Sequence, residues 1–166
     1  MINMRVSEAA EALDVSAPHV DATFVGGSTD SRSIDKNQLF VALRGPNFDG
    51  HEFVGAAETR GASAVMVDHH RTGTPPALLV EDTRVSLGRL AGVWRDRFSL
   101  PIAAVTGSNG KTTVKEMLAS ILAVKGPILA TQGNLNNDVG VPLTLMRIGA
   151  ESRYAVVELG ANHVGE

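Results

Sequence analysis

The 166-residue sequence has no cysteine, no long apolar run and no strong excess of either charge. The absence of cysteine excludes disulfide bonds and thiolate metal sites, and it fits an intracellular location. No apolar run reaches the roughly 18 residues that a membrane-crossing helix needs, so we expect no membrane insertion. The net charge of −3 gives no electrostatic reason to expect nucleic acid as a partner. The first 15 residues, MINMRVSEAAEALDV, lack the basic start and apolar core of a signal peptide, and we therefore predict a cytoplasmic globular protein.

The first part of the chain mixes a helical pattern with short strand-like segments. Residues 6–13 are periodic as in a helix, and residues 39–43, 64–67 and 77–80 are short, apolar and bounded by Gly, Pro or charge, as in buried strands. A helix that ends near Gly61 is predicted between the first two strands. We expect a small α/β domain over residues 1–82.

A second pattern begins after residue 82. Apolar residues recur at helical spacing from Leu87 to Phe98, with arginines on the opposite, solvated face. Strands are predicted at 101–107, 127–131 and 154–159, with helices around 114–122 and 139–148 between them. Alternating strands and helices indicate an open parallel α/β sheet. Because such sheets are normally larger, we expect residues 83–166 to be the first part of a larger α/β domain in a longer protein.

The stretch AVTGSNGKTTVKEML (residues 104–118) joins a predicted strand to a predicted helix through glycines. Backbone N–H groups in such a turn, together with the positive end of the helix, bind phosphate. Lys111 would lie over the outer phosphates and the Thr112 hydroxyl could ligate Mg²⁺. The predicted phosphate-binding residues are Gly107, Ser108, Asn109, Gly110, Lys111, Thr112 and Thr113. A glycine turn with a surface lysine is the structural alternative.

A second Mg²⁺ ligand is expected from the end of a neighbouring strand. Glu158 closes the apolar segment YAVVEL, and ligands gather at the carboxyl ends of strands in open α/β sheets. The alternative is a solvated carboxylate. His163 is either a metal or substrate contact or an ordinary loop histidine.

These segments resemble the Mur ligases, ATP-dependent amide ligases that build the peptide of peptidoglycan precursors. The family loop is typically TGTNGKT[ST], and here it is TGSNGKTT; it departs from the common GxxxxGK[ST] pattern because Val105 stands at the first glycine position. The segment STDSRSIDKNQLFVALRGPNFDGHEF (residues 28–53) resembles the family's UDP-binding N-terminal domain. GNLNNDVGVPLTL and VVELGANHVGE are most similar to the member that adds D-alanyl-D-alanine to UDP-N-acetylmuramoyl-tripeptide.

The resemblance implies roles for individual residues. Lys111 and Thr112 would bind ATP phosphates and Mg²⁺, Glu158 would bind Mg²⁺, and Lys111 and Glu158 would be catalytic. Asn137 stands where the family places nucleotide-facing or substrate-facing residues. The positions that match segments around the uridine diphosphate are Ser31, Arg32, Asn47, Asp49 and Gly50. Their alternatives are a turn with an ion pair at Ser31 and Arg32, and a plain connecting loop around Asn47.

The resemblance also implies a reaction: ATP activates the terminal carboxylate of the tripeptide, and the amine of D-alanyl-D-alanine then attacks. We expect a carbamylated lysine and a C-terminal domain beyond Glu166, an inactive fragment in these residues alone, and a monomer at full length. Two alternatives stay open. One is another Mur step, such as addition of diaminopimelate or lysine, and the other is a non-catalytic nucleotide-sugar binding module.

Overall fold

The computed structural model describes residues 1–69 and 75–160, and the chain divides into two compact units, Met1–Leu90 and Ala91–Glu166. Both units are mixed α/β with parallel sheets, which confirms the predicted fold class. The division between the units falls inside helix α3 (Thr83–Arg95), whereas the expected domain boundary at residues 82 and 83 lies at the start of that helix. The domain boundary itself stays a prediction.

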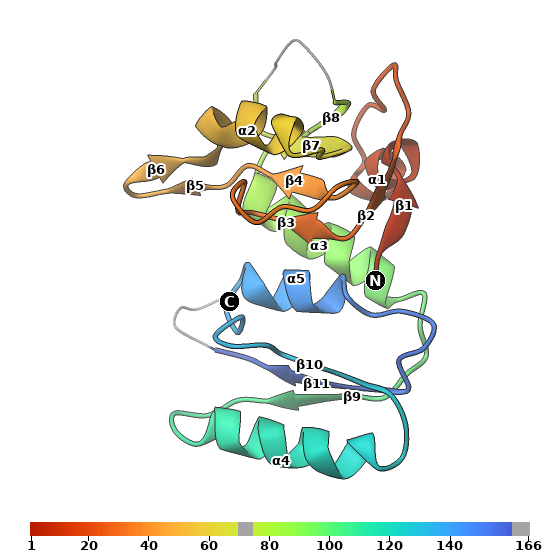
Figure 1. Cartoon of the computed structure of the whole chain (residues 1–166), viewed down its shortest axis with the longest axis vertical. Coiled ribbons are helices and arrows are strands. Elements are labelled where there is room, and N and C mark those ends of the chain that lie inside the picture. The colour runs from red at the N-terminus through yellow and green to blue at the C-terminus, as the bar shows by residue number, and fades with distance from the viewer. Residues whose placement is uncertain (70–74, 161–166) are drawn as a thin grey trace. The chain divides into compact units, whose positions relative to one another are not determined.

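The first unit is built on a four-stranded parallel sheet in the order β3-β4-β7-β8 (Figure 1). Its strands are β3 (Gly27–Ser28), β4 (Leu39–Val41), β7 (Ala64–Val67) and β8 (Ala77–Leu79). The three apolar segments that predicted strands therefore form β4, β7 and β8. Two antiparallel pairs accompany the sheet: β1 (Asn3–Arg5) with β2 (Thr23–Val25), and the hairpin β5 (Arg44–Gly45) with β6 (Phe48–Asp49).

Helices cover this sheet because its strands are apolar on both sides. All residues of β4 and β7 are buried, as expected for parallel strands between helices. The helical elements of the unit are α1 (Val6–Leu13), the 3₁₀ helix η1 (Gly50–Phe53), α2 (Val54–Thr59) and the first part of α3. Val54 and Ala57 of α2 pack with Phe40 and Val65 in one core cluster.

The second unit places its strands in the order β10-β11-β9, all parallel. In chain order its elements are β9 (Ile102–Val105), α4 (Lys111–Ala123), β10 (Ile128–Ala130), α5 (Gly140–Leu145) and β11 (Tyr154–Glu158). Helix α4 lies on one face of the sheet and α5 on the other (Figure 1). Within residues 1–69 and 75–160, no helix is long and apolar enough to span a bilayer.

Helix α4 forms where the sequence predicts it, but its covered face differs from the predicted one. The helical periodicity predicts that Val114, Met117 and Ile121 pack on the sheet, yet their side chains are 47%, 61% and 61% exposed. Lys115 is instead 2% exposed, and α4 contacts mainly β11 and β10. Periodicity identifies an apolar stripe, but the position of the neighbouring strands decides which side of the helix is covered.

Candidate functional site

The glycine loop between β9 and α4 has the backbone shape that its sequence predicts. Gly107 and Gly110 have φ values of +138° and +75°, a region that side-chain-bearing residues rarely adopt. A Cβ atom at Gly110 would meet nothing within 4 Å, and at Gly107 only the Asn109 carbonyl oxygen at 4.0 Å. Glycine is therefore required at both positions by backbone conformation, and the loop leaves open space beside it.

Lys111 begins α4 and turns back over this loop. Its Nζ donates a hydrogen bond to the Gly107 carbonyl oxygen at 2.7 Å. The first bond of the helix runs from Val114 N–H to the Gly110 carbonyl oxygen at 3.0 Å, so the N–H groups of Lys111, Thr112 and Thr113 precede the helical ladder. An ammonium group and the positive end of a helix are thus combined at one loop, an arrangement that favours an anion.

A buried carboxylate lies next to the start of α4. Glu158 ends β11 opposite Val105 of β9, and it is 3% exposed. The Thr112 hydroxyl donates toward its oxygens at 3.1 and 3.3 Å, and Asn136 Nδ2 donates to Oε1 at 2.9 Å. The two residues that the sequence proposes as Mg²⁺ ligands, Thr112 and Glu158, are therefore in contact at the carboxyl ends of neighbouring parallel strands.

Lys115 is buried and contacts the end of β10, and the sequence analysis did not select it. Its buried Nζ donates to the Thr131 carbonyl oxygen at 2.9 Å and pairs with Glu116 at 2.6 Å. The Thr131 hydroxyl accepts from the Glu158 N–H at 2.9 Å, so α4, the end of β10 and the end of β11 are linked by two successive polar contacts. A lysine in the middle of a helix gives no sequence signal of burial, because lysine is almost always exposed.

The loop before α5 places two asparagines differently. The Asn137 side chain accepts from the Val139 and Gly140 N–H groups at 3.3 and 2.8 Å and so holds the start of α5. Asn136, which the sequence analysis did not select, provides the contact to Glu158. The nucleotide-facing role of Asn137 stays a prediction, and His163 lies outside the described residues.

The predicted substrate residues of the first unit follow two adjacent parallel strands, β3 and β4. Ser31 is buried, and the Arg32 guanidinium pairs with both carboxylate oxygens of Asp30, at 2.9 and 2.8 Å, while its side chain is 87% exposed. Asn47 lies exposed in the turn of the β5–β6 hairpin, Asp49 ends β6, and Gly50 begins η1. Both segments therefore follow the carboxyl ends of parallel strands, where ligands gather in α/β sheets.

Two carboxylates in these segments are held in the ionised form. Hydrogen bonds from the Arg32 side chain and backbone lower the pKa of Asp30 to about 2. Hydrogen bonds from the His51 backbone and ring lower the pKa of Asp49 below its ordinary value. Both groups are accessible to water and negatively charged at neutral pH, so a phosphate in this region must be met by other groups, such as arginines or backbone N–H donors.

Two family models match the chain. Residues 23–91 match the model described as "Mur ligase family, catalytic domain", and residues 105–166 match "Mur ligase middle domain". The two matches correspond to the two sequence segments that carry the candidate residues: the loops after β3 and β4, and the glycine loop with Glu158.

Curated relatives and solved structures agree with these matches. The UDP-N-acetylmuramoyl-tripeptide–D-alanyl-D-alanine ligase of Escherichia coli K12 is 45% identical over all 166 residues, which are 37% of its own length. The Bacillus subtilis 168 ligase of the same name is 36% identical, and the match covers all of this chain and 38% of the relative's length. The chain therefore spans little more than a third of the length of these relatives.

Among solved structures, MurF from Acinetobacter baumannii aligns with a TM-score of 0.90 and 39% identity, over 100% of this chain and 38% of its own. MurF ligase from Thermotoga maritima in complex with ADP aligns with a TM-score of 0.74 and 32% identity, over 84% of this chain and 33% of its own. A UDP-N-acetylmuramoyl-L-alanyl-D-glutamate–2,6-diaminopimelate ligase aligns with a TM-score of 0.56 and 21% identity, over 96% of this chain and 36% of its own. This last likeness shows only a shared fold.

Proposed function

Because this chain belongs to the Mur ligase family, we propose that it supplies the nucleotide-sugar-binding and ATP-binding parts of a ligase that joins D-alanyl-D-alanine to UDP-N-acetylmuramoyl-tripeptide in the cytoplasm. The observation that carries the proposal is the contact between the Thr112 hydroxyl and the buried Glu158 carboxylate, 3.1 Å apart beside the glycine loop. Relatives with this ligase name cover the whole chain, which favours this step over addition of diaminopimelate or lysine.

The residues present fit ATP and Mg²⁺. Magnesium prefers oxygen ligands and often takes only one or two from the protein, and Thr112 and Glu158 offer a hydroxyl and a carboxylate. The open space beside Gly110 leaves room for a phosphate to approach the backbone. A relative of this chain has been solved in complex with ADP, which supports a nucleotide as the ligand.

Each residue of the site has a task in this proposal. Bound ATP supplies the phosphoryl group that activates a carboxylate for attack by an amine. Lys111, released from the Gly107 carbonyl, places a positive charge on the outer phosphates. The N–H groups that precede the helical ladder of α4 orient the phosphates. Asn136 and Thr131 hold Glu158 in place, so its carboxylate is positioned before any ligand arrives.

The first unit would hold the uridine diphosphate end of the second substrate. Ser31 and Arg32 follow β3, and Asn47, Asp49 and Gly50 follow β4 through the β5–β6 hairpin and the start of η1. The Arg32 side chain is 87% exposed, so it can turn from Asp30 to a diphosphate. A guanidinium can bind two phosphate oxygens at once, which suits this role.

The proposal is tested by titrating this chain with Mg-ATP and with UDP-N-acetylmuramoyl-tripeptide in a calorimeter. We expect both ligands to bind, ATP in a Mg²⁺-dependent manner, and we expect Glu158→Gln to weaken the Mg²⁺ dependence only. If the chain binds the nucleotide sugar but does not bind Mg-ATP, the result instead supports a non-catalytic nucleotide-sugar binding module.

The reaction is tested on the protein that contains these 166 residues. With ATP, Mg²⁺, the tripeptide substrate and D-alanyl-D-alanine, mass spectrometry should detect the dipeptide-extended product and release of ADP. If diaminopimelate or lysine is incorporated in place of the dipeptide, the assignment to this ligation step is wrong.

A further inference from the structure

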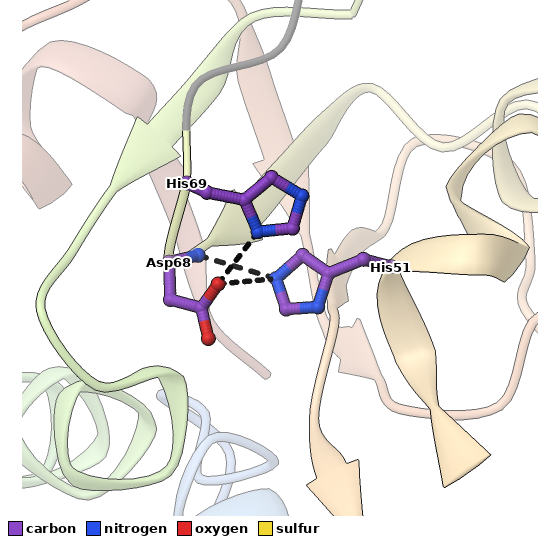
Figure 2. Close-up of side chains that lie close together, drawn as sticks. All are labelled: His51, Asp68 and His69. Carbon is purple, nitrogen blue, oxygen red and sulfur yellow. Dashed lines mark hydrogen bonds and ion pairs between the residues drawn. The ribbon is translucent and has the colours of Figure 1, made fainter.

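The side chains of His51, Asp68 and His69 converge in the first unit (Figure 2). His51 belongs to η1, and Asp68 and His69 directly follow β7. One ligand atom from each residue lies within 4.8 Å of the others. We propose that these three side chains bind one divalent transition-metal ion of the zinc class through His51 Nε2, Asp68 Oδ1 and His69 Nδ1.

Hydrogen bonds fix the His51 ring in the form that a metal ligand needs. The Asp68 backbone N–H donates to His51 Nε2 at 3.2 Å, so this nitrogen carries a lone pair. The other ring nitrogen, Nδ1, lies 2.5 Å from Asp49 Oδ1, where a ring N–H would donate. Metal-binding histidines typically donate their second ring N–H to a carboxylate in this way, which fixes the ring orientation.

Both imidazole nitrogens lie near one carboxylate oxygen, so a cation bound here would replace the Asp68 N–H donor at His51 Nε2 and the ring proton between His69 Nδ1 and Asp68 Oδ1. Asp68 Oδ1 lies 3.2 Å from His51 Nε2 and 2.7 Å from His69 Nδ1. With zinc bonds of about 2.0–2.2 Å, ligand atoms around a tetrahedral ion lie roughly 3.3–3.6 Å apart. The His51–Asp68 spacing is therefore close to the required one. The His69 ring must shift to reach this spacing from both partners, and its side chain is 53% exposed.

The donor set selects the class of metal. Two imidazole nitrogens and one carboxylate oxygen suit zinc and its neighbours in the first transition row, whereas Mg²⁺ and Ca²⁺ prefer oxygen ligands alone. Three protein ligands leave a fourth tetrahedral position for water. His51 and Asp68 are largely buried, with side chains 7% and 18% exposed, which shields two of the three ligands from competing water.

Arg44 competes for the same position. Its guanidinium donates to Asp68 Oδ1 at 3.0 Å and lies 3.3 Å from His69 Nδ1. A metal ion must displace this positive charge from the carboxylate. The Arg44 side chain is 55% exposed, so it can turn out to solvent, and its removal should strengthen metal binding.

The test is titration of this chain with Zn²⁺ in excess Mg²⁺, which occupies oxygen-only sites, followed by titration with Co²⁺ as a spectroscopic probe. We expect one ion per chain and the visible absorption of tetrahedral Co²⁺. His69→Ala and His51→Gln should each weaken Zn²⁺ binding by about tenfold or more, and Arg44→Ala should tighten it several-fold.

His19→Ala is the matched control, because His19 is an exposed histidine outside the cluster, and its Zn²⁺ affinity should equal that of the wild type. Circular dichroism checks that each variant is folded. Absence of Zn²⁺ binding by the wild type overturns the proposal. So does Zn²⁺ binding that is unchanged in the His69→Ala variant, which removes the most exposed ligand with the least risk to the fold.

Discussion

Lys111 is the residue on which the nucleotide proposal depends most directly. Its ammonium group now satisfies the Gly107 carbonyl and would satisfy phosphate oxygens in the complex. Hydrogen bonds to charged groups contribute about 1.5–3 kcal/mol, so Lys111→Ala should weaken Mg-ATP binding by about tenfold or more. Calorimetry on the wild type and the variant measures this change.

Lys125→Ala is the control for Lys111→Ala, because Lys125 is exposed just after α4 and should leave Mg-ATP binding unchanged. The fold should survive in both variants, since neither lysine is buried. Equal affinities in the wild type and Lys111→Ala would remove the lysine from the phosphate site.

Asp30 gives a pH-dependent prediction. Arg32 lowers its pKa from 3.8 to about 2, so the folded state binds the proton more weakly than the unfolded state. The associated stabilisation is present above the ordinary pKa and is lost as the pH falls from about 4 to about 2. Because both side chains are solvent-exposed, the effect on stability should be small.

NMR titration of the Asp30 side-chain carboxyl measures this shift. We expect a midpoint near 2 in the wild type and a midpoint in the ordinary aspartate range in Arg32→Ala. A wild-type midpoint close to 4 would show that the Asp30–Arg32 pair is not formed in solution, and Arg32 would then be free to bind a ligand at no cost in a lost ion pair.

At the scale of elements, a buried hydroxyl links the start of α3 to the segment after β4 in the first unit. Thr83, 4% exposed, donates to the Ala42 carbonyl oxygen at 2.8 Å. Thr83→Val keeps the shape of the side chain but leaves that carbonyl without this donor, which should cost about 1–3 kcal/mol of the free energy of unfolding. Urea denaturation measures the loss.

Thr83→Ser keeps the hydroxyl and serves as the comparison, since it removes only a methyl group. We expect it to lose clearly less stability than Thr83→Val. If the two variants are equally destabilised, the hydrogen bond to Ala42 does not anchor the helix.

Local sequence patterns predicted where helices and strands lie better than they predicted which side chains are buried or in contact. The loop from Gly107 to Thr112 was predictable because glycine conformation, lysine charge and helix start all lie within a few residues. The contact of Glu158 with Thr112 followed from the rule that parallel strands end at one edge. The buried Lys115 and the contact from Asn136 were not predictable, because each depends on a partner distant in the chain. The exposed side of α4 was mispredicted for the same reason.

At the scale of the whole molecule, each unit contains a core cluster of its own. Phe40 and Val65 belong to a cluster formed within the first unit, and Leu129, Ile148 and Ala155 to one within the second. The single tryptophan, Trp94, donates to the Ile148 carbonyl oxygen at 3.0 Å and therefore reports on the second unit.

Phe40→Ala should consequently destabilise the first unit selectively. Truncation of a buried phenylalanine costs about 3–5 kcal/mol, so the circular dichroism transition of the variant should begin at lower urea concentration. The midpoint of the Trp94 fluorescence transition should change much less. Leu129→Ala should have the opposite pattern, and coincident shifts of both signals in both variants would show that the chain unfolds as one cooperative unit.

The order of strands in the second unit has a consequence for synthesis on the ribosome. Strand β11 pairs with both β9 and β10, yet it is translated after them. A nascent chain that ends before Tyr154 therefore contains the glycine loop and α4 but no complete pair of strands in this sheet. Glu158 is the last residue of β11, so the glycine loop and the Glu158 carboxylate can meet only after this strand has been synthesised. Until then the apolar strands β9 and β10 are unpaired, which is the interval in which chaperones protect nascent chains.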